Sequence, residues 1–246
     1  MKVKDLLPIP DIELSKKILA VQPHPDDLEL FAGGTLAKMA DKGMEITYIT
    51  VTNGGYGTYD KNISPEVLTN IRKIEAKSAS SLLGIAEHVF LEYTDSEVID
   101  HKSLRNQLIH LIRNNKPEGI FLPDPWLPYE AHQGHVITGL AGAEAAIFSS
   151  LPHLEPTTPV HELKFIVFYA THRPNTYIDI SSYWERKIEA IKCHKSQFNE
   201  DVFTLLSLYL SLKASEYGAY LDVEKAEAFK VLTPLHLHAN TDSWDA

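Results

Sequence analysis

A histidine and two adjacent carboxylates stand close together in the segment 23–29, which reads Pro-His-Pro-Asp-Asp-Leu-Glu. Residues 17–23 form a short apolar run that is typical of a buried parallel strand. Two carboxylates at the end of a buried strand are costly unless they bind a cation. Asp26 and Asp27 therefore predict a divalent metal site, in which one aspartate is a ligand while its neighbour, pointing elsewhere, stays free as a base.

Two further histidines, His132 and His135, stand at the start of an expected helix. His24, Asp27 and His135 would make a set of two histidines and one carboxylate, which suits a catalytic zinc with open positions for water and substrate. Each motif alone has a plainer explanation, since an H-x-x-H sequence can cap a helix and the four residues His-Pro-Asp-Asp can form a tight turn. Together, in loops of one predicted sheet, they favour a metal site.

The elements that must position these residues alternate along the chain between apolar strand patterns and amphipathic helix patterns. Such alternation implies right-handed βαβ units, a parallel sheet and helices on both of its faces. The predicted fold is therefore α/β, a Rossmann-like three-layer arrangement with a mainly parallel sheet. The expected strands are 17–23, 45–52, 88–92, 119–122 and 163–170, and the expected helices are 33–42, 65–83, 101–115 and 135–149.

The proline-rich segment 151–160 is the best candidate for a linker, but a strand pattern resumes directly after it. We therefore expect a single domain over residues 1–246, with a mainly helical region after residue 181 and a flexible polar tail at 240–246. Ligands of parallel sheets bind beyond the carboxyl ends of the strands. This rule selects four loops, at 23–29, 53–58, 93–97 and 123–135.

Composition excludes several classes of protein. The chain has 246 residues with 23 Lys+Arg and 33 Asp+Glu, a formal charge of −10, which argues against nucleic acid as the main partner. Its apolar stretches are far shorter than the roughly 18 residues that a membrane span needs, and the N-terminal segment does not have the pattern of a signal peptide. The single cysteine, Cys193, excludes an intramolecular disulfide and a thiolate zinc cluster. These features predict a soluble, cytoplasmic protein without a membrane partner.

The run 20–58, AVQPHPDDLELFAGGTLAKMADKGMEITYITVTNGGYGT, resembles the opening of the LmbE-like (PIG-L) family of zinc-dependent N-acetylglucosaminyl deacetylases. The resemblance continues at residues 72–76 (Arg-Lys-Ile-Glu-Ala), at 93–95 (Tyr-Thr-Asp), at the Lys-Pro turn of 116–117, at 132–135 and at 194–197 (His-Lys-Ser-Gln). It covers residues 17 to 198, and its first motif is highly specific.

The resemblance implies a role for each matching residue. It implies that one zinc ion per chain is held by three ligands: His24, Asp27 and His135. Asp26 matches the general base, and His132 matches the second acid–base or electrostatic group, which faces the oxyanion. Arg72 and Asp95 match positions that contact sugar hydroxyls, although Arg72 has the alternative of pairing with Glu75 on the same helix.

The family further implies a hydrolase that removes the acetyl group from an N-acetylglucosamine unit of a small saccharide or conjugate, releasing acetate. Two alternatives stay open. One is a metal-dependent amidase that acts on another small N-acyl substrate, and the other is a sugar-binding relative with weakened catalysis. A homo-oligomer is possible.

One departure from the family pattern supports the second alternative. The family's second motif usually reads His-Pro-Asp-His, whereas this chain has Gly134 in place of the aspartate. A carboxylate there would favour the charged imidazolium of His132. Glu130 and Asp124 lie in the same loop and are the candidates to replace it.

Two groups of histidines outside these motifs are expected to be structural. His236 and His238 alternate in a late polar segment, which is typical of an exposed strand. His194 is expected on a helix surface or packed near the end of the sheet.

Overall fold

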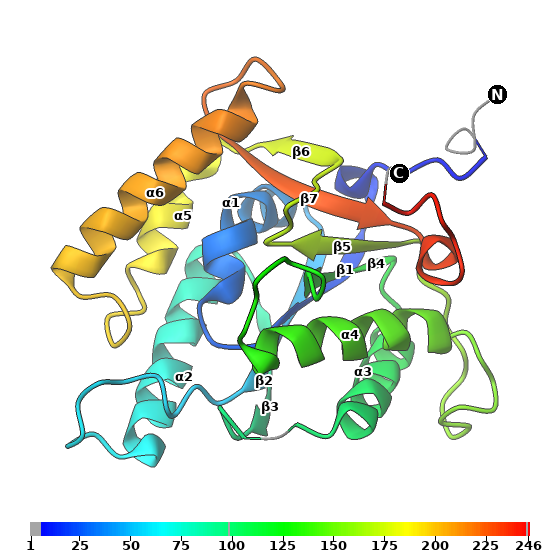
Figure 1. The fold of residues 1–246 in the computed structure, drawn as a ribbon, viewed down its shortest axis with the longest axis horizontal. Coiled ribbons are helices and arrows are strands. Elements are labelled where there is room, and N and C mark those ends of the chain that lie inside the picture. Colours follow the sequence, from blue (N-terminus) through cyan, green and yellow to red (C-terminus); the bar gives the residue numbers. More distant parts are fainter. Residues whose placement is uncertain (1–5, 98, 245) are drawn as a thin grey trace.

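The computed structural model describes residues 6–97, 99–244 and 246 (Figure 1). Seven strands form one sheet in the order β3-β2-β1-β4-β5-β7-β6. The strands are β1 (Lys17–Gln22), β2 (Glu45–Thr52), β3 (Glu87–Tyr93), β4 (Gly119–Pro123), β5 (Phe165–Tyr169), β6 (Thr176–Asp179) and β7 (Ala226–Leu232). Strands β1 to β5 are parallel to one another, and β7 runs antiparallel to both β5 and β6. The expected α/β fold with a mainly parallel sheet is confirmed.

Helices cover both faces of this sheet. They are α1 (Asp27–Asp41), α2 (Pro65–Leu82), α3 (His101–Asn115), α4 (Gln133–Phe148), α5 (Trp184–Ile191) and α6 (Glu200–Gly218). Helices α1, α2 and α5 contribute to one buried apolar cluster, and α3 and α4 contribute to the other. Strand β1 contributes side chains to both clusters, because Ile18 and Ala20 belong to the first cluster while Leu19 and Val21 belong to the second.

The carboxyl-terminal third differs from the expectation. Helices α5 and α6 lie there as predicted, but β7 follows them and β6 precedes them. The β7 sequence, AEAFKVL, contains helix-favouring residues and no strict alternation, because every one of its side chains is buried. Its Glu227 is satisfied inside the protein by Lys187 Nζ at 2.6 Å and by the backbone N–H groups of Gly34 and Thr35. Contacts with other parts of the fold, and not the local sequence pattern, therefore determine that this segment forms strand β7.

The expectation of an exposed strand around His236 is wrong. His236 lies in a short 3-10 helix, Pro234–Leu237, and is only 4% exposed. Its Nδ1 lies 2.8 Å from the hydroxyl of Thr233, which caps the same turn. Proline at the first position favours this turn over a strand. Of the helices in the described ranges, none is both long and apolar enough to cross a membrane.

Candidate metal centre and active site

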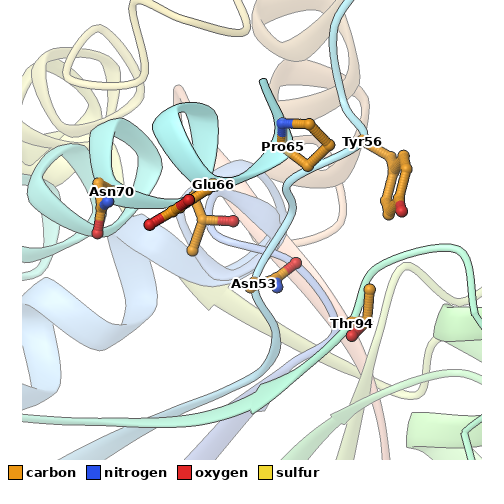
Figure 2. Close-up of a pocket in the computed structure, with 7 residues that line it drawn as sticks. Asn53, Tyr56, Pro65, Glu66, Asn70 and Thr94 are labelled. Atoms are coloured by element: carbon orange, nitrogen blue, oxygen red, sulfur yellow. The ribbon is translucent and has the colours of Figure 1, made fainter. Parts of the chain in front are cut away.

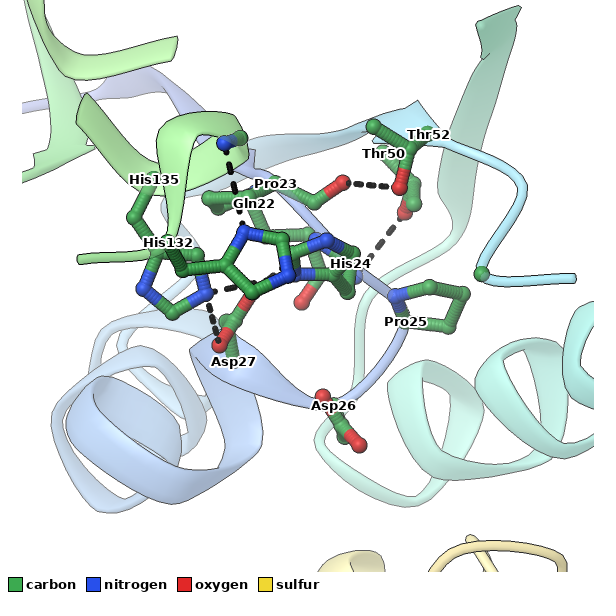
Figure 3. Close-up of polar contacts among 12 residues, drawn as sticks. Gln22, Pro23, His24, Pro25, Asp26, Asp27, Thr50, Thr52, His132 and His135 are labelled. Atoms are coloured by element: carbon green, nitrogen blue, oxygen red, sulfur yellow. Dashed lines mark hydrogen bonds and ion pairs between the residues drawn. The ribbon is translucent and has the colours of Figure 1, made fainter. Parts of the chain in front are cut away.

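The candidate site lies where parallel strands end side by side. Strands β1 and β4 are neighbours in the sheet, so the loops that follow them leave at the same edge. The first loop carries His24 and Asp26 and leads directly into α1, and the second carries Glu130 and His132 and leads into α4. Figure 3 shows the imidazoles of His24, His132 and His135 gathered above Asp27, with Asp26 turned away from them.

Helix α1 begins at Asp27, six residues earlier than the sequence pattern predicts. Two hydrogen bonds build this start: Asp27 Oδ2 accepts from the backbone N–H of His24 at 2.9 Å, and the Leu28 N–H donates to Gln22 Oε1 at 2.9 Å. The preceding residue, Asp26, has a φ of 131°, which a non-glycine residue rarely adopts. Such a conformation costs about 1–3 kcal/mol and is typical of functional sites.

Three predicted ligands converge closely enough to hold a metal ion. His24 Nδ1 lies 3.2 Å from His135 Nε2 and 3.4 Å from Asp27 Oδ2, and His135 Nε2 lies 3.5 Å from Asp27 Oδ1. Ligand atoms at about 2.0–2.1 Å from a tetrahedral zinc ion are about 3.3 Å from one another. The spacing of His24, Asp27 and His135 therefore fits such an ion.

A second set of possible ligands shares two of these residues. Nitrogen atoms of His24, His132 and His135 all lie within 4.8 Å of one another. The set with Asp27 has contacts of 3.2 to 3.5 Å, made through both carboxylate oxygens, and it also supplies the negative charge that a divalent cation needs.

The charges of the cluster favour a cation at His24. Burial lowers the pKa of His24, but its hydrogen bonds to Asp27 and Asp95 outweigh burial and raise that pKa to about 9. Burial has the opposite effect on the carboxyl group of Asp27 and raises its pKa, but the hydrogen bond to His24 outweighs burial and lowers the pKa of Asp27 to about 2. Two ionised carboxylates therefore stabilise positive charge at the point where the imidazoles meet.

Asp26 has a different environment. Burial raises its pKa to about 6, against the opposing effect of the Arg72 guanidinium. Arg72 Nη2 donates to Asp26 Oδ2 at 3.2 Å and to the carbonyl oxygen of Pro25 at 2.8 Å. Its Nη1 donates to the carbonyl oxygen of Gly54 at 3.0 Å, and a Cβ on Gly54, whose φ is 64°, would lie 2.6 Å from that nitrogen. The Gly-rich loop thus packs directly on Arg72.

Arg72 and Asp95 are held inside the protein. Arg72 is 3% exposed and Asp95 is 4% exposed. Asp95 Oδ1 lies 3.2 Å from His24 Nε2. Burial raises the pKa of Asp95, but the contact with His24 outweighs burial and lowers that pKa to about 2. The alternative partner of Arg72, Glu75, instead accepts hydrogen bonds from the backbone and hydroxyl of Ser196. A direct contact of Arg72 or Asp95 with a sugar hydroxyl stays a prediction.

His132 caps α4 with its side chain. Its Nδ1 accepts from the Gly134 N–H at 3.2 Å, so the neutral imidazole carries its proton on Nε2. Burial, together with the charges of His24 and His135, lowers the pKa of His132. A Cβ on Gly134 would lie 3.1 Å from His132 Nδ1 and 3.3 Å from His24 Nε2. Glycine at this position therefore lets the helix start approach both imidazoles.

Glu130 does not replace the missing carboxylate beside His132. Its Oε2 lies 3.1 Å from His135 Nδ1, and its Oε1 accepts from the backbone N–H of His132 at 2.7 Å. Asp124, the other candidate, accepts from the backbone N–H of Trp126 at 2.9 Å. Glu130 thus orients the imidazole of His135, a contact that the sequence spacing did not indicate.

His194 is buried, contrary to one of the two expectations for it. It is 0% exposed, and its Nε2 lies 3.6 Å from Oε2 of the equally buried Glu29. Burial lowers the pKa of His194, but Glu29 outweighs burial and raises it. The sequence places Glu29 in the predicted loop 23–29 but does not identify it as the partner of His194.

A cavity of about 350 Å³ lies next to the loop that carries Asp95 (Figure 2). Loop and helix residues line it: Asn53, Tyr56, Pro65, Glu66, Thr69, Asn70 and Thr94. Asn53 Oδ1 accepts from the backbone N–H of Asp95 at 3.2 Å. The cavity therefore adjoins the loop that places Asp95 against His24.

Comparisons with known proteins agree on one family. The profile described as PIG-L, GlcNAc-PI de-N-acetylase, matches residues 19–146. Diacetylchitobiose deacetylase of Thermococcus kodakarensis is 36% identical over 228 residues, 91% of this chain and 85% of that protein. The structure of N,N′-diacetylchitobiose deacetylase from Pyrococcus horikoshii, solved with an inhibitor, superposes with a TM-score of 0.89 at 36% identity, covering 93% and 88% of the two chains.

A relative with another activity is also similar. The 4-oxalmesaconate hydratase of Pseudomonas putida is 25% identical over 197 residues, which are 74% of each chain. One fold therefore carries more than one chemistry.

Proposed function

The chain belongs to the PIG-L (LmbE-like) family, and we propose that it is a metal-dependent deacetylase that removes the N-acetyl group from an N-acetylglucosamine-containing saccharide. The observation that carries this proposal is the convergence of His24 Nδ1, Asp27 and His135 Nε2 at 3.2 to 3.5 Å, with a further carboxylate next in sequence. The resemblance of the whole chain to two diacetylchitobiose deacetylases supports the substrate class.

In this proposal His24, Asp27 and His135 hold one zinc ion. A bound zinc ion supplies Lewis acidity toward the amide carbonyl and toward water. Glu130 and Asp95 contact the far nitrogens of the two ligand imidazoles, at 3.1 Å and 3.2 Å. Carboxylates in such positions fix the orientation of a ligand histidine and raise its basicity. We therefore assign Asp95 as well as Glu130 a positioning role.

Asp26 is the general base. Its Oδ2 is held by Arg72, so Oδ1 is the oxygen that takes the proton of the attacking water. Because Asp26 points away from the imidazoles, it stays outside the ligand set and free for proton transfer (Figure 3). The same oxygen then delivers the proton to the departing nitrogen, since an amide nitrogen leaves poorly unless it is protonated.

His132 acts as a neutral hydrogen-bond donor. Its Nδ1 is occupied by the Gly134 N–H, and the proton on Nε2 is available for the carbonyl oxygen as negative charge develops there. Without a carboxylate beside it, His132 has little support as an imidazolium. Asp26 therefore carries both proton transfers.

The proposal is tested by acetate release from N,N′-diacetylchitobiose, with and without a chelator. We expect one zinc per chain by elemental analysis, loss of acetate release after chelation, and recovery when zinc is added back. Acetate release that persists in metal-free protein would overturn the metal assignment. A metal-dependent activity on other small amides, without activity on the acetylated sugar, would favour the amidase alternative.

Glu130→Gln should weaken zinc binding by about 10- to 100-fold, because the variant loses the negative charge that orients and polarises His135. Competition with a chelator measures this change. Asp124→Asn is the matched control, since Asp124 caps the same loop and contacts the Trp126 backbone. Equal zinc affinity in Glu130→Gln and in the wild type would remove Glu130 from the site.

A further inference from the structure

Asp26, the proposed general base, depends on other residues for its orientation. Its φ of 131° is a strained backbone conformation, which persists only where the surrounding structure holds it. Its side chain makes no capping hydrogen bond to α1, whereas Ser64 and Asp100 cap α2 and α3 in that way. The contact of Asp26 Oδ2 with Arg72 Nη2, at 3.2 Å, therefore places the carboxylate, and it requires α1 and α2 to keep a fixed spacing.

A second carboxylate follows each partner of this contact by three residues. Glu29 follows Asp26 in the first turn of α1, where the Leu30 N–H donates to the Asp26 carbonyl oxygen at 3.0 Å. Glu75 follows Arg72 on α2. Residues three apart are neighbours on one side of a helix. A contact that fixes Glu29 relative to Glu75 therefore also fixes Asp26 relative to Arg72.

One short segment contacts both of these carboxylates. Residues 194–196 lie in the turn after α5, a helix that packs against both α1 and α2 (Figure 1). The backbone N–H of Ser196 donates to Glu75 Oε1 at 2.9 Å, and the Ser196 hydroxyl donates to Glu75 Oε2 at 2.6 Å. His194 Nε2 lies 3.6 Å from Glu29 Oε2. The contacts thus close a ring of side chains: Asp26, Arg72, Glu75, Ser196, His194 and Glu29.

The part of the ring formed by His194 and Glu29 is fully buried. Both side chains are 0% exposed, and among the described residues neither the ring nitrogens of His194 nor the carboxylate oxygens of Glu29 have a hydrogen-bond partner. Burial lowers the pKa of His194, but the contact with Glu29 and, after it, the charge of Asp26 outweigh burial and raise that pKa. A buried ion pair adds little stability compared with apolar side chains of similar volume. The pair is therefore better explained by its proximity to Asp26 than by folding.

We propose that the 194–196 segment is a positioning element for the general base: it fixes α1 against α2, so that Arg72 keeps Asp26 Oδ1 free for the attacking water. None of its residues belongs to the proposed ligand set, and each acts through Asp26. This inference rests on the proposed deacetylase function, which assigns Asp26 the role of base. Damage to the segment should lower kcat and leave KM and the zinc content unchanged.

Glu75→Ala tests the ring, because it removes the acceptor of both Ser196 hydrogen bonds. We expect kcat for acetate release from N,N′-diacetylchitobiose to fall about 10- to 100-fold, since a small displacement of a reacting group has effects of this size. Glu75→Gln should recover most of the loss, because its amide oxygen can still accept from Ser196. Ser78→Ala is the matched control: Ser78 is exposed on α2, its hydroxyl donates to the Ile74 carbonyl oxygen, and its loss should leave kcat unchanged.

The same substitution in an Asp26→Asn background separates positioning from a general loss of structure. If the segment acts through Asp26, Glu75→Ala should have little further effect on the residual kcat once the base is absent. An equal fall in both backgrounds, an unchanged kcat in Glu75→Ala, or a higher KM at constant kcat would each overturn the inference and leave the deacetylase function intact. The same holds if Glu75→Gln is as slow as Glu75→Ala, because the charge and not the hydrogen bonds would then matter.

If Glu75→Ala does not fold, Ser196→Ala replaces it, because it removes the hydroxyl and keeps the backbone N–H. We expect kcat to fall about 10-fold in Ser196→Ala and to recover in Ser196→Thr. Absence of acetate release from the wild type would instead contradict the proposed function. Crystal structures of the wild type and Ser196→Ala then test the positioning directly: loss of the contact between Asp26 and Arg72 in the variant supports it, and an unchanged contact overturns it.

Discussion

Replacing Asp26 with asparagine is expected to lower kcat by about 10² to 10⁴ while the zinc content stays at one ion per chain. Asparagine keeps the shape of the side chain, and its amide oxygen can still accept from Arg72 Nη2. It cannot take a proton from water at Oδ1. Initial rates of acetate release, together with elemental analysis of the same preparation, measure both halves of this expectation.

Two controls separate chemistry from folding. Asp201→Asn makes the same change at an exposed residue of α6 and should leave the rate unchanged. Thermal unfolding of Asp26→Asn shows whether the loss of charge beside the buried Arg72 destabilises the protein. Loss of zinc in Asp26→Asn, with zinc retained in Asp27→Asn, would mean that the roles of the two aspartates are exchanged.

Replacing Asp27 with alanine is expected to abolish zinc binding and, with it, acetate release. Asp27 is the only negatively charged member of the proposed ligand set, and its oxygens lie 3.4 Å and 3.5 Å from the two imidazole nitrogens. Removing a carboxylate that orients a ligand already costs about 10- to 100-fold in metal affinity, and removing the ligand itself should cost more. Elemental analysis after gel filtration measures the zinc that remains.

His24→Ala should have the same effect, because it removes Nδ1 from the centre of the cluster. Circular dichroism should show that both variants keep the α/β fold, since these residues lie at the edge of the sheet and outside its two apolar clusters. Full zinc occupancy in both single variants would reject this ligand set. The set of three histidines, His24, His132 and His135, would then be the remaining candidate, and His132→Ala would test it.

The amino-acid sequence was sufficient for the frame of the protein and for the identity of the proposed ligands. Strands β1, β4 and β5 are nearly continuous apolar runs, β2 is rich in β-branched and aromatic residues, and the helices between the strands have local apolar patterns and caps, such as Ser64 before Pro65. Because parallel strands end at one edge of the sheet, motifs that follow β1 and β4 must meet there. The sequence alone therefore predicts that His24, Asp27 and His135 lie together.

The tertiary structure decided which side chains face one another. Glu130 contacts the imidazole of His135 but only the backbone N–H of His132, because the side chain of His132 caps the start of α4. Strand β7 forms because antiparallel partners and the buried Lys187 satisfy groups that its own sequence leaves open. The cavity lined by Glu130 and His135 is also lined by Tyr177 of β6 and Tyr209 of α6, which lie more than 40 and more than 70 residues later in the chain, and no local periodicity records such a contact. Sequence patterns report how each segment is buried, whereas the partner of a polar side chain depends on how separate elements pack.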